Sequence, residues 1–243
     1  MIQIPLTSAT DGMTGIPLPY LLHSDPMVTC IMFLCMLLVS VVFAHGKKHF
    51  LQGLKNFVRG RERGSMFDEV TASDVRHTIV LVFHTCLMLA FGVYRYLAQS
   101  APALFEQYSH LGILAGLTAI FILFLLFKWA AYSLVNSLFF QKVRNELWIT
   151  SFVNLFIWLG IVLLPLLLVI VYFDISSHIA TFLLAFPLVL GKICLFCKCF
   201  SNFFEKIHGV FHLILYFCAL EILPDLLFWK GIELANNNLI LNF

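Results

Sequence analysis

Charged residues are scarce in this sequence. Only 12% of its 243 residues are Asp, Glu, Lys or Arg, whereas 61% are hydrophobic. A water-soluble domain carries about 25% charged residues, so too little polar surface is present to cover a globule in water. The net charge of +2 gives no reason to expect nucleic acid as a partner. The composition therefore predicts a protein whose solvent is the bilayer, with membrane lipids as partners.

Motifs of known chemistry are also lacking. We find no catalytic constellation, no nucleotide-binding loop, no complete metal site and no clear internal repeat. The cysteine run CLFCKC (194–199) has no second C-x-x-C pair, which favours free apolar cysteines over a redox or metal motif. Residues 1–26 contain no Lys or Arg, whereas a cleavable signal peptide begins with a basic region. We interpret them as an outward-facing N-terminal tail.

Long apolar runs are what the sequence has in abundance. A spanning helix needs about 20 mostly apolar residues, and continuous runs do not fit the alternating pattern of barrel strands. The sequence therefore predicts an all-α, polytopic bundle of six transmembrane helices in one domain, residues 27–243. The six spans are expected at 27–44, 77–98, 111–134, 148–173, 179–200 and 210–235.

Basic residues are distributed very unevenly among the connections. Cytoplasmic connections of membrane proteins are enriched in Lys and Arg, and 13 of the 15 basic residues fall at or near three alternate connections. Both termini are therefore expected outside and these connections inside, with Arg95 and Lys230 toward the outer face. The 13 residues are Lys47, Lys48, Lys55, Arg59, Arg61, Arg63, Arg76, Lys128, Lys142, Arg144, Lys192, Lys198 and Lys206.

The first cytoplasmic connection, residues 46–76, contains an amphipathic pattern. Its apolar residues recur at helical spacing and its basic residues lie off that stripe, which predicts a helix with two different faces. One interpretation is a helix in the inner headgroup layer, with its basic face on anionic lipid. The other is a docking helix for a protein partner. The residues concerned are Phe50, Leu54, Phe57, Lys48, Lys55 and Arg59.

Two carboxylates stand inside the sixth expected span. Glu221 lies close to the expected midplane, and Asp225 follows one helical turn later on the same face. Charged groups in a bilayer mark a functional site or an internal pair. One hypothesis is therefore an ion or ligand site at Glu221 and Asp225, and the other is a structural pair of Glu221 with Lys192 or Lys128.

Mid-helix prolines occur in three successive spans. Pro165, Pro187 and Pro224 each remove a backbone hydrogen bond, and Pro224 should leave the Leu220 carbonyl free. Irregular backbone at membrane depth is tolerated where it is buried in protein or lines a water-filled cavity. We therefore expect a cavity among spans four to six.

Histidines gather near the expected inner face. Pairs at i, i+4 lie on one face of a helix and can ligate a metal, and histidines on facing helices can ligate haem. Chance spacing is the alternative, and we expect no resident cofactor. The histidines are His45, His49, His77, His84, His208 and His212.

The segments NSLFFQKVRNELW (136–148), VYFDISSHI (171–179) and ILYFCALEILPDLLFWKGI (214–232) resemble an uncharacterised multi-span inner-membrane family of Bacteroidota, catalogued as domain of unknown function 4271. The resemblance covers most of the chain. It implies residence in the inner membrane of a Gram-negative cell, and it supplies neither a reaction nor catalytic residues.

Three functions agree with these patterns. The first is a non-catalytic accessory or scaffold subunit of a cell-envelope membrane complex, which would have other membrane proteins as partners. The second is a small transporter or ion- or proton-binding protein that uses Glu221 and Asp225. The third is a membrane enzyme that acts on a lipid or a quinone. The lack of clustered acid–base residues makes an enzyme the least favoured of the three.

Overall fold

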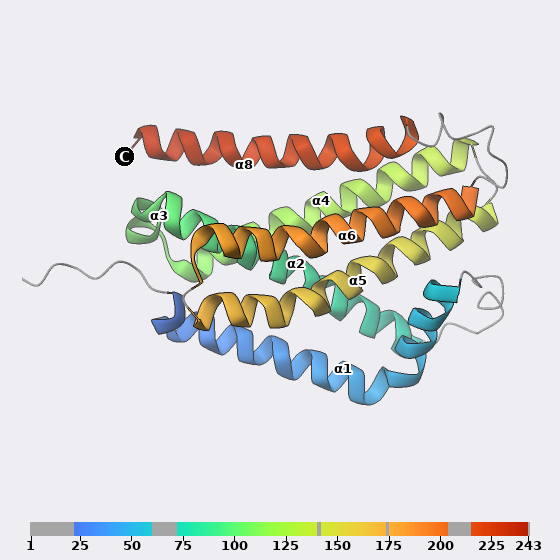
Figure 1. Ribbon diagram of the computed structural model, residues 1–243, viewed down its shortest axis with the longest axis horizontal. Helices are drawn as coiled ribbons and strands as arrows, with labels where there is room; N and C mark the ends of the chain where they lie inside the picture. Colours follow the sequence, from blue (N-terminus) through green and yellow to red (C-terminus); the bar gives the residue numbers. More distant parts are fainter. Residues whose placement is uncertain (1–21, 60–71, 140–141, 174, 204–214, 243) are drawn as a thin grey trace, which may run out of the picture.

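The computed structural model describes residues 22–59, 72–139, 142–173, 175–203 and 215–242, and within these ranges every regular element is helical (Figure 1). The predicted all-α class is therefore confirmed. The elements are η1 (Leu22–Ser24), α1 (Pro26–Arg59), α2 (Ala72–Ser100), α3 (Pro102–Gln107), α4 (His110–Phe139), α5 (Lys142–Tyr172), α6 (Ser177–Phe203), the π-helical turn η4 (Cys218–Ile222) and α8 (Leu223–Asn242).

Five helical segments of the described chain are long and apolar enough to cross a membrane. They correspond to the first five expected spans, with ends that differ by a few residues. The expected sixth span, 210–235, is described from residue 215 onward and forms η4 and α8. α8 itself carries Asp225, Lys230 and Glu233 and is not among these five segments. The five segments are Pro26–Ala44, Val75–Ser100, His110–Leu138, Asn145–Tyr172 and Ser177–Phe200.

Successive long helices run in opposite directions (Figure 1). The beginnings of α1, α4 and α6 lie at the same end of the bundle as α3 and the end of α8, which we call the α3 end. The end of α4 and the beginning of α5 lie at the other end, which we call the α4–α5 end. The alternation brings the start of α8 back beside α4 and α6.

The centre of the bundle is formed by α2 and α5. α2 packs against α5, α4 and α1, and α5 also packs against α6. α2 and α5 approach closely at Gly160 of α5, where an added Cβ would lie 2.8 Å from the Thr85 Cα of α2. Toward the α3 end α1, α2, α4 and α5 share a hydrophobic core that includes Met32, Phe91 and Leu167.

The first connection differs from the expected arrangement. α1 continues as a helix to Arg59, so the predicted amphipathic helix is a continuation of the first spanning helix, and this part turns away from the rest of α1 (Figure 1). The side chains from His45 to Arg59, including all six proposed docking residues, lie outside the described residues. The two faces of this helix remain a prediction.

The α3 end contains an unpredicted helix and a polar contact. Pro102 stands at the start of α3, in the connection between the second and third expected spans, and proline is favoured at a first helical position. The carboxylate of Asp25 caps α1 by accepting from the Met27 N–H at 2.9 Å and also contacts His110 Nδ1 at 2.8 Å. This contact joins the start of α1 to the start of α4.

Candidate functional site

Four charged side chains from three different parts of the bundle meet inside it. Lys128 of α4 lies 2.6 Å from the Glu221 carboxylate of η4 and 2.7 Å from that of Asp225 in α8. Lys192 of α6 contacts Glu221 as well and lies 2.5 Å from Asp225. We call these four residues the charge cluster. The predicted placement of both carboxylates on one face holds, because both contact the same two lysines.

The charge cluster pairs two cations with two anions, and two of its four side chains are buried. Glu221 is fully buried and Lys128 is 5% exposed, whereas Lys192 and Asp225 are each exposed by more than a third. Buried charges are costly unless each has an opposite partner and further hydrogen bonds, and here two ammonium groups face two carboxylates. The pairing of Glu221 with both lysines is therefore present, as the structural hypothesis expected. A ligand role for the same four residues remains a proposal.

Helix geometry explains why Glu221 can reach both lysines. Pro224 cannot donate a backbone hydrogen bond, and the turn before it widens into the π-helical turn Cys218–Ile222, in which the Leu223 N–H bonds to the Cys218 carbonyl. The helix thus passes through Pro224 without breaking. Such π-turns are frequent at functional sites. Here the turn contains Glu221, its one charged residue, whose side chain contacts both lysines.

A row of polar residues on α4 continues the cluster toward the α4–α5 end. Tyr132, one turn after Lys128 and 1% exposed, donates its hydroxyl proton to Glu221 Oε1. One turn further, Asn136 accepts from the Tyr216 hydroxyl at 2.6 Å and donates to Asn145 Oδ1 at 3.0 Å. Our sequence analysis missed Tyr132 and Asn136, although their i, i+4 spacing from Lys128 was a usable signal.

Lys128 and Lys192 lie deeper than the sequence suggested. Each stands eleven residues before the last residue of its helix, Phe139 or Phe203, which is about 16 Å along the axis. Our assignment of both lysines to the ends of their spans was therefore wrong. The polar heads are drawn into the bundle by Glu221 and Asp225 rather than directed to the aqueous edge.

A cavity of about 530 Å³ extends from the charge cluster toward the α3 end. Its walls come from α2, α4, α5, α6 and α8, so it includes the expected spans four to six and two further helices. Three members of the cluster, Lys128, Lys192 and Asp225, line it, and Arg95 and Gln99 line its other end. The walls between are aromatic and aliphatic, which is the usual construction of a small-molecule site.

The wall formed by α8 is attached to the bundle in two ways. At its beginning the charge cluster joins it to α4 and α6. Further along, ring contacts hold it: Phe228 lies with its ring centroid 5.1 Å from Phe121 and 4.4 Å from Phe124, and Trp229 lies 5.9 Å from Tyr96. These rings also border the cavity.

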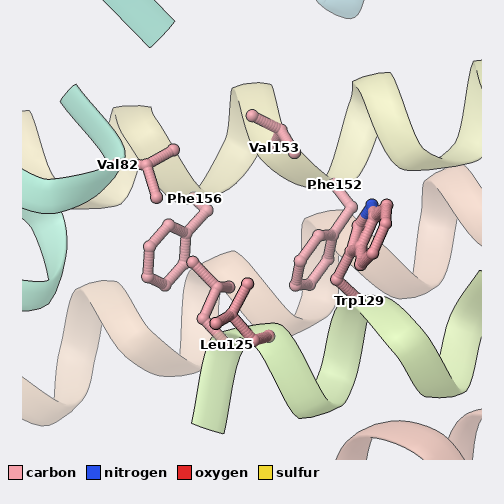
Figure 2. A pocket seen from close by; sticks show the side chains of 7 residues that line it. Val82, Leu125, Trp129, Phe152, Val153 and Phe156 are labelled. Carbon is pink, nitrogen blue, oxygen red and sulfur yellow. The ribbon is translucent and has the colours of Figure 1, made fainter. Parts of the chain in front are cut away.

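A smaller cavity of about 270 Å³ lies between α2, α4 and α5 (Figure 2). Figure 2 shows Phe152 and Phe156 of α5 facing Leu125 of α4, and these three residues also line the larger cavity. All of its lining residues are apolar or aromatic. Polar groups that would orient a ligand do not converge on it, so we assign the site to the larger cavity.

The histidines expected near the inner face are only partly described. His77 is half-buried at the start of α2, and His84 is buried where α2 packs against Gly160 of α5. The side chains of His45, His49, His208 and His212 lie outside the described residues. No group of three metal-binding side chains occurs in the part of the chain that the structure describes, so metal or haem stays a hypothesis.

Comparison with known proteins gives a family and no function. No curated protein and no solved structure matches this chain. A family model described as "Domain of unknown function (DUF4271)" matches residues 28–232, from the start of α1 to the middle of α8, and so includes the charge cluster and the whole cavity. The chain, in which five of the described helical segments are long and apolar enough to cross a membrane, therefore belongs to this family.

Proposed function

We propose that this chain is a multi-pass inner-membrane protein that binds an amphipathic small molecule within the bilayer, as a small transporter or carrier does. The observation that carries the proposal is that the 530 Å³ cavity ends on the charge cluster. Intramembrane charges are costly and mark functional sites by default. A large apolar cavity with a few converging polar groups is the feature from which ligand sites are inferred.

We further propose six spans, with α8 as the sixth, and both termini on the periplasmic side of a Bacteroidota cell. The alternation of helix directions supports an even number of spans (Figure 1). After Lys128 and Lys192 are set aside as intramembrane residues, eleven of the 15 basic residues still belong to the connections at the α4–α5 end. By the positive-inside rule, this distribution supports a cytoplasmic position for that end.

The orientation predicts the behaviour of reporter fusions. Alkaline phosphatase fused after Phe243 should be active and green fluorescent protein at the same site dark, because each folds on only one side of the membrane. Fusions after Arg144, at the start of α5, should give the reverse. Enzyme activity and fluorescence of intact cells are the measurements. Equal phosphatase activity at the two positions would contradict an even number of spans.

A second candidate is an accessory subunit of a cell-envelope complex. α4 exposes Gly112, Ala115, Gly116 and Ala119 along one face, and nothing lies within 4 Å of the position of a Cβ at Gly116. Small residues at this spacing are typical of helix–helix contacts in membranes. This face therefore favours a neighbouring transmembrane helix, in addition to the ligand in the cavity.

A pair of alanine-to-phenylalanine substitutions separates the two candidates. Ala185 of α6 lines the cavity and Ala119 lies on the exposed face of α4. Ala185→Phe should fill the cavity and remove a bound amphiphile while any protein partner stays. Ala119→Phe should leave the amphiphile in place and remove the partner. The measurement is mass spectrometry of lipids and proteins that co-purify with native-level, tagged protein in mild detergent.

The two readouts decide the candidates independently. An amphiphile enriched over bulk lipid in the wild type and in Ala119→Phe, and lost from Ala185→Phe, would support binding in the cavity. The same lipid profile in all three proteins would refute it. A stoichiometric protein partner lost only from Ala119→Phe would support the accessory role, and purification of the wild type without a constant partner would refute that role.

A further inference from the structure

We infer that the α3 end of the cavity binds the anionic head of an amphiphile, with Arg95 as its charged partner, and that the apolar chain extends toward Lys192. The inference rests on the proposed binding function and specifies its ligand class. Arg95 and Gln99 come from the last two turns of α2, and Ser177 begins α6; all three line the cavity. From Ser177 to Lys192 the cavity wall extends about 22 Å along α6.

Arg95 is an unusual cation. It is only 8% exposed although it stands in a spanning helix. Its Nη2 donates to the Ile175 carbonyl at 3.0 Å, whereas a guanidinium group offers five N–H donors. Among the described side chains, no carboxylate lies within ion-pair distance of it. A buried guanidinium with unused donors that border a cavity is suited to a carboxylate or phosphate, which it can bind through two parallel hydrogen bonds.

The charge balance of the cavity selects this end for the head. At the other end, Lys128 and Lys192 are neutralised by Glu221 and Asp225, so an added anion would have to displace an existing partner. Arg95 adds one positive charge with no carboxylate in the described residues to balance it. An anionic head therefore binds with a more favourable electrostatic free energy at the α3 end, and the apolar walls between the two ends contact its chain.

The surroundings of Arg95 define the head further. Gln99, one turn later on the same face, accepts from the Ser177 hydroxyl at 2.8 Å and keeps its amide donors for another acceptor. The Tyr96 and Trp229 rings lie beside the same end, and such rings are enriched at headgroup level. The shared chemistry is a compact anion on an apolar chain, which a fatty acid and a lysophosphatidate both provide.

The test is equilibrium binding to the purified full-length chain in phosphatidylcholine nanodiscs. Oleate and oleoyl lysophosphatidate supply the two anions, and oleyl alcohol and oleylamine supply the same chain without a charge or with a positive one. We expect at least one anion to bind about tenfold or more tightly than the alcohol, because hydrogen bonds to charged groups are the stronger class. Whichever of the two anions binds more tightly identifies the head as carboxylate or phosphate.

Variants assign the binding to Arg95. Arg95→Gln should lower the affinity for the anion by about tenfold or more and leave the affinity for oleyl alcohol unchanged. Arg95→Lys should bind the anion with an affinity between those of Arg95→Gln and the wild type, because the charge remains but the two parallel hydrogen bonds are lost. Lys230→Gln, which removes an exposed cation of α8 that is paired with Glu233, is the matched control and should bind as the wild type does. Size-exclusion profiles report whether each variant is folded.

Each contrary outcome identifies which proposal fails. If oleyl alcohol binds as tightly as both anions, or if Arg95→Gln behaves as Lys230→Gln does, the head assignment is wrong. The cavity proposal survives that result provided that Ala185→Phe still abolishes binding of every probe. If Ala185→Phe binds all probes as the wild type does, the ligands lie elsewhere and both proposals are wrong.

Discussion

Replacing Glu221 with glutamine is expected to lower the unfolding midpoint of the protein in detergent by on the order of 10 °C. The substitution keeps the shape of the side chain and removes its charge. Lys128 and Lys192 would then share the single carboxylate of Asp225. Lys128 would remain 5% exposed but would have lost one of the two carboxylates that neutralise it. Breaking a buried ion pair from one side costs about 3–5 kcal/mol.

The double variant Lys128→Met, Glu221→Gln distinguishes charge pairing from side-chain size. It restores neutrality, because Lys192 and Asp225 remain as a pair 2.5 Å apart. The fall in its midpoint should therefore be much smaller than the falls for Lys128→Met and Glu221→Gln added together. Glu233→Gln is the control, since Glu233 pairs with Lys230 at the surface of α8 and exposed pairs contribute little. Equal midpoints for Glu221→Gln and Glu233→Gln would show that the charge cluster does not stabilise the fold.

Replacing Gly160 with alanine should destabilise the bundle through its central contact. The added Cβ would lie 2.7 Å from the Thr85 Cβ and 2.8 Å from the Thr85 Cα, and no side-chain rotation can move those atoms. α2 and α5 would have to separate, although they form the main contact of the fold. Overpacking costs about 1–3 kcal/mol even when neighbours can adjust, and here the neighbour is backbone.

The matched control is Gly116→Ala on α4, because nothing lies within 4 Å of that position. Its midpoint should equal or slightly exceed that of the wild type, since alanine favours a helix over glycine. Adding Thr85→Ala to Gly160→Ala should restore little of the lost midpoint, because Thr85→Ala removes only the hydroxyl and methyl groups and leaves the Cα and Cβ contacts. A wild-type midpoint for Gly160→Ala would mean that α2 and α5 are not in close contact there.

Hydropathy was enough to predict where the helices lie, and the reason is physical. A bilayer requires a minimum length of apolar helix, so the first five expected spans coincide with five long helices of the structure. Lipid-facing and buried positions are both apolar, however, and pattern alone does not show which faces meet. The close approach at Gly160 depends on those faces and was not predicted. The cavity was expected among spans four to six, but the part that α2 and α4 play in its walls was not.

The charge cluster was only half predictable for a related reason. Glu221 and Asp225 were identified because carboxylates are rare at such depth, and Lys128 and Lys192 were named as partners. Their depth was misjudged because an isolated lysine near the end of an apolar run is normally assigned to the membrane edge. Tyr132 was missed because its i, i+4 spacing from Lys128 does not by itself show which residue it contacts. Its contact with Glu221 appears only when η4 lies beside α4.

The attachment of α8 has a consequence for how a ligand would enter and leave. Ion pairs fix this helix at its beginning, whereas ring contacts of Phe228 and Trp229 hold it further along. Each such contact is worth about 0.5–1.5 kcal/mol, less than the roughly 3–5 kcal/mol lost when a buried ion pair is broken from one side. We therefore expect α8 to pivot at the π-helical turn when its aromatic ring contacts break. It would open sideways into the lipid, and an amphiphile would never have to pass through water.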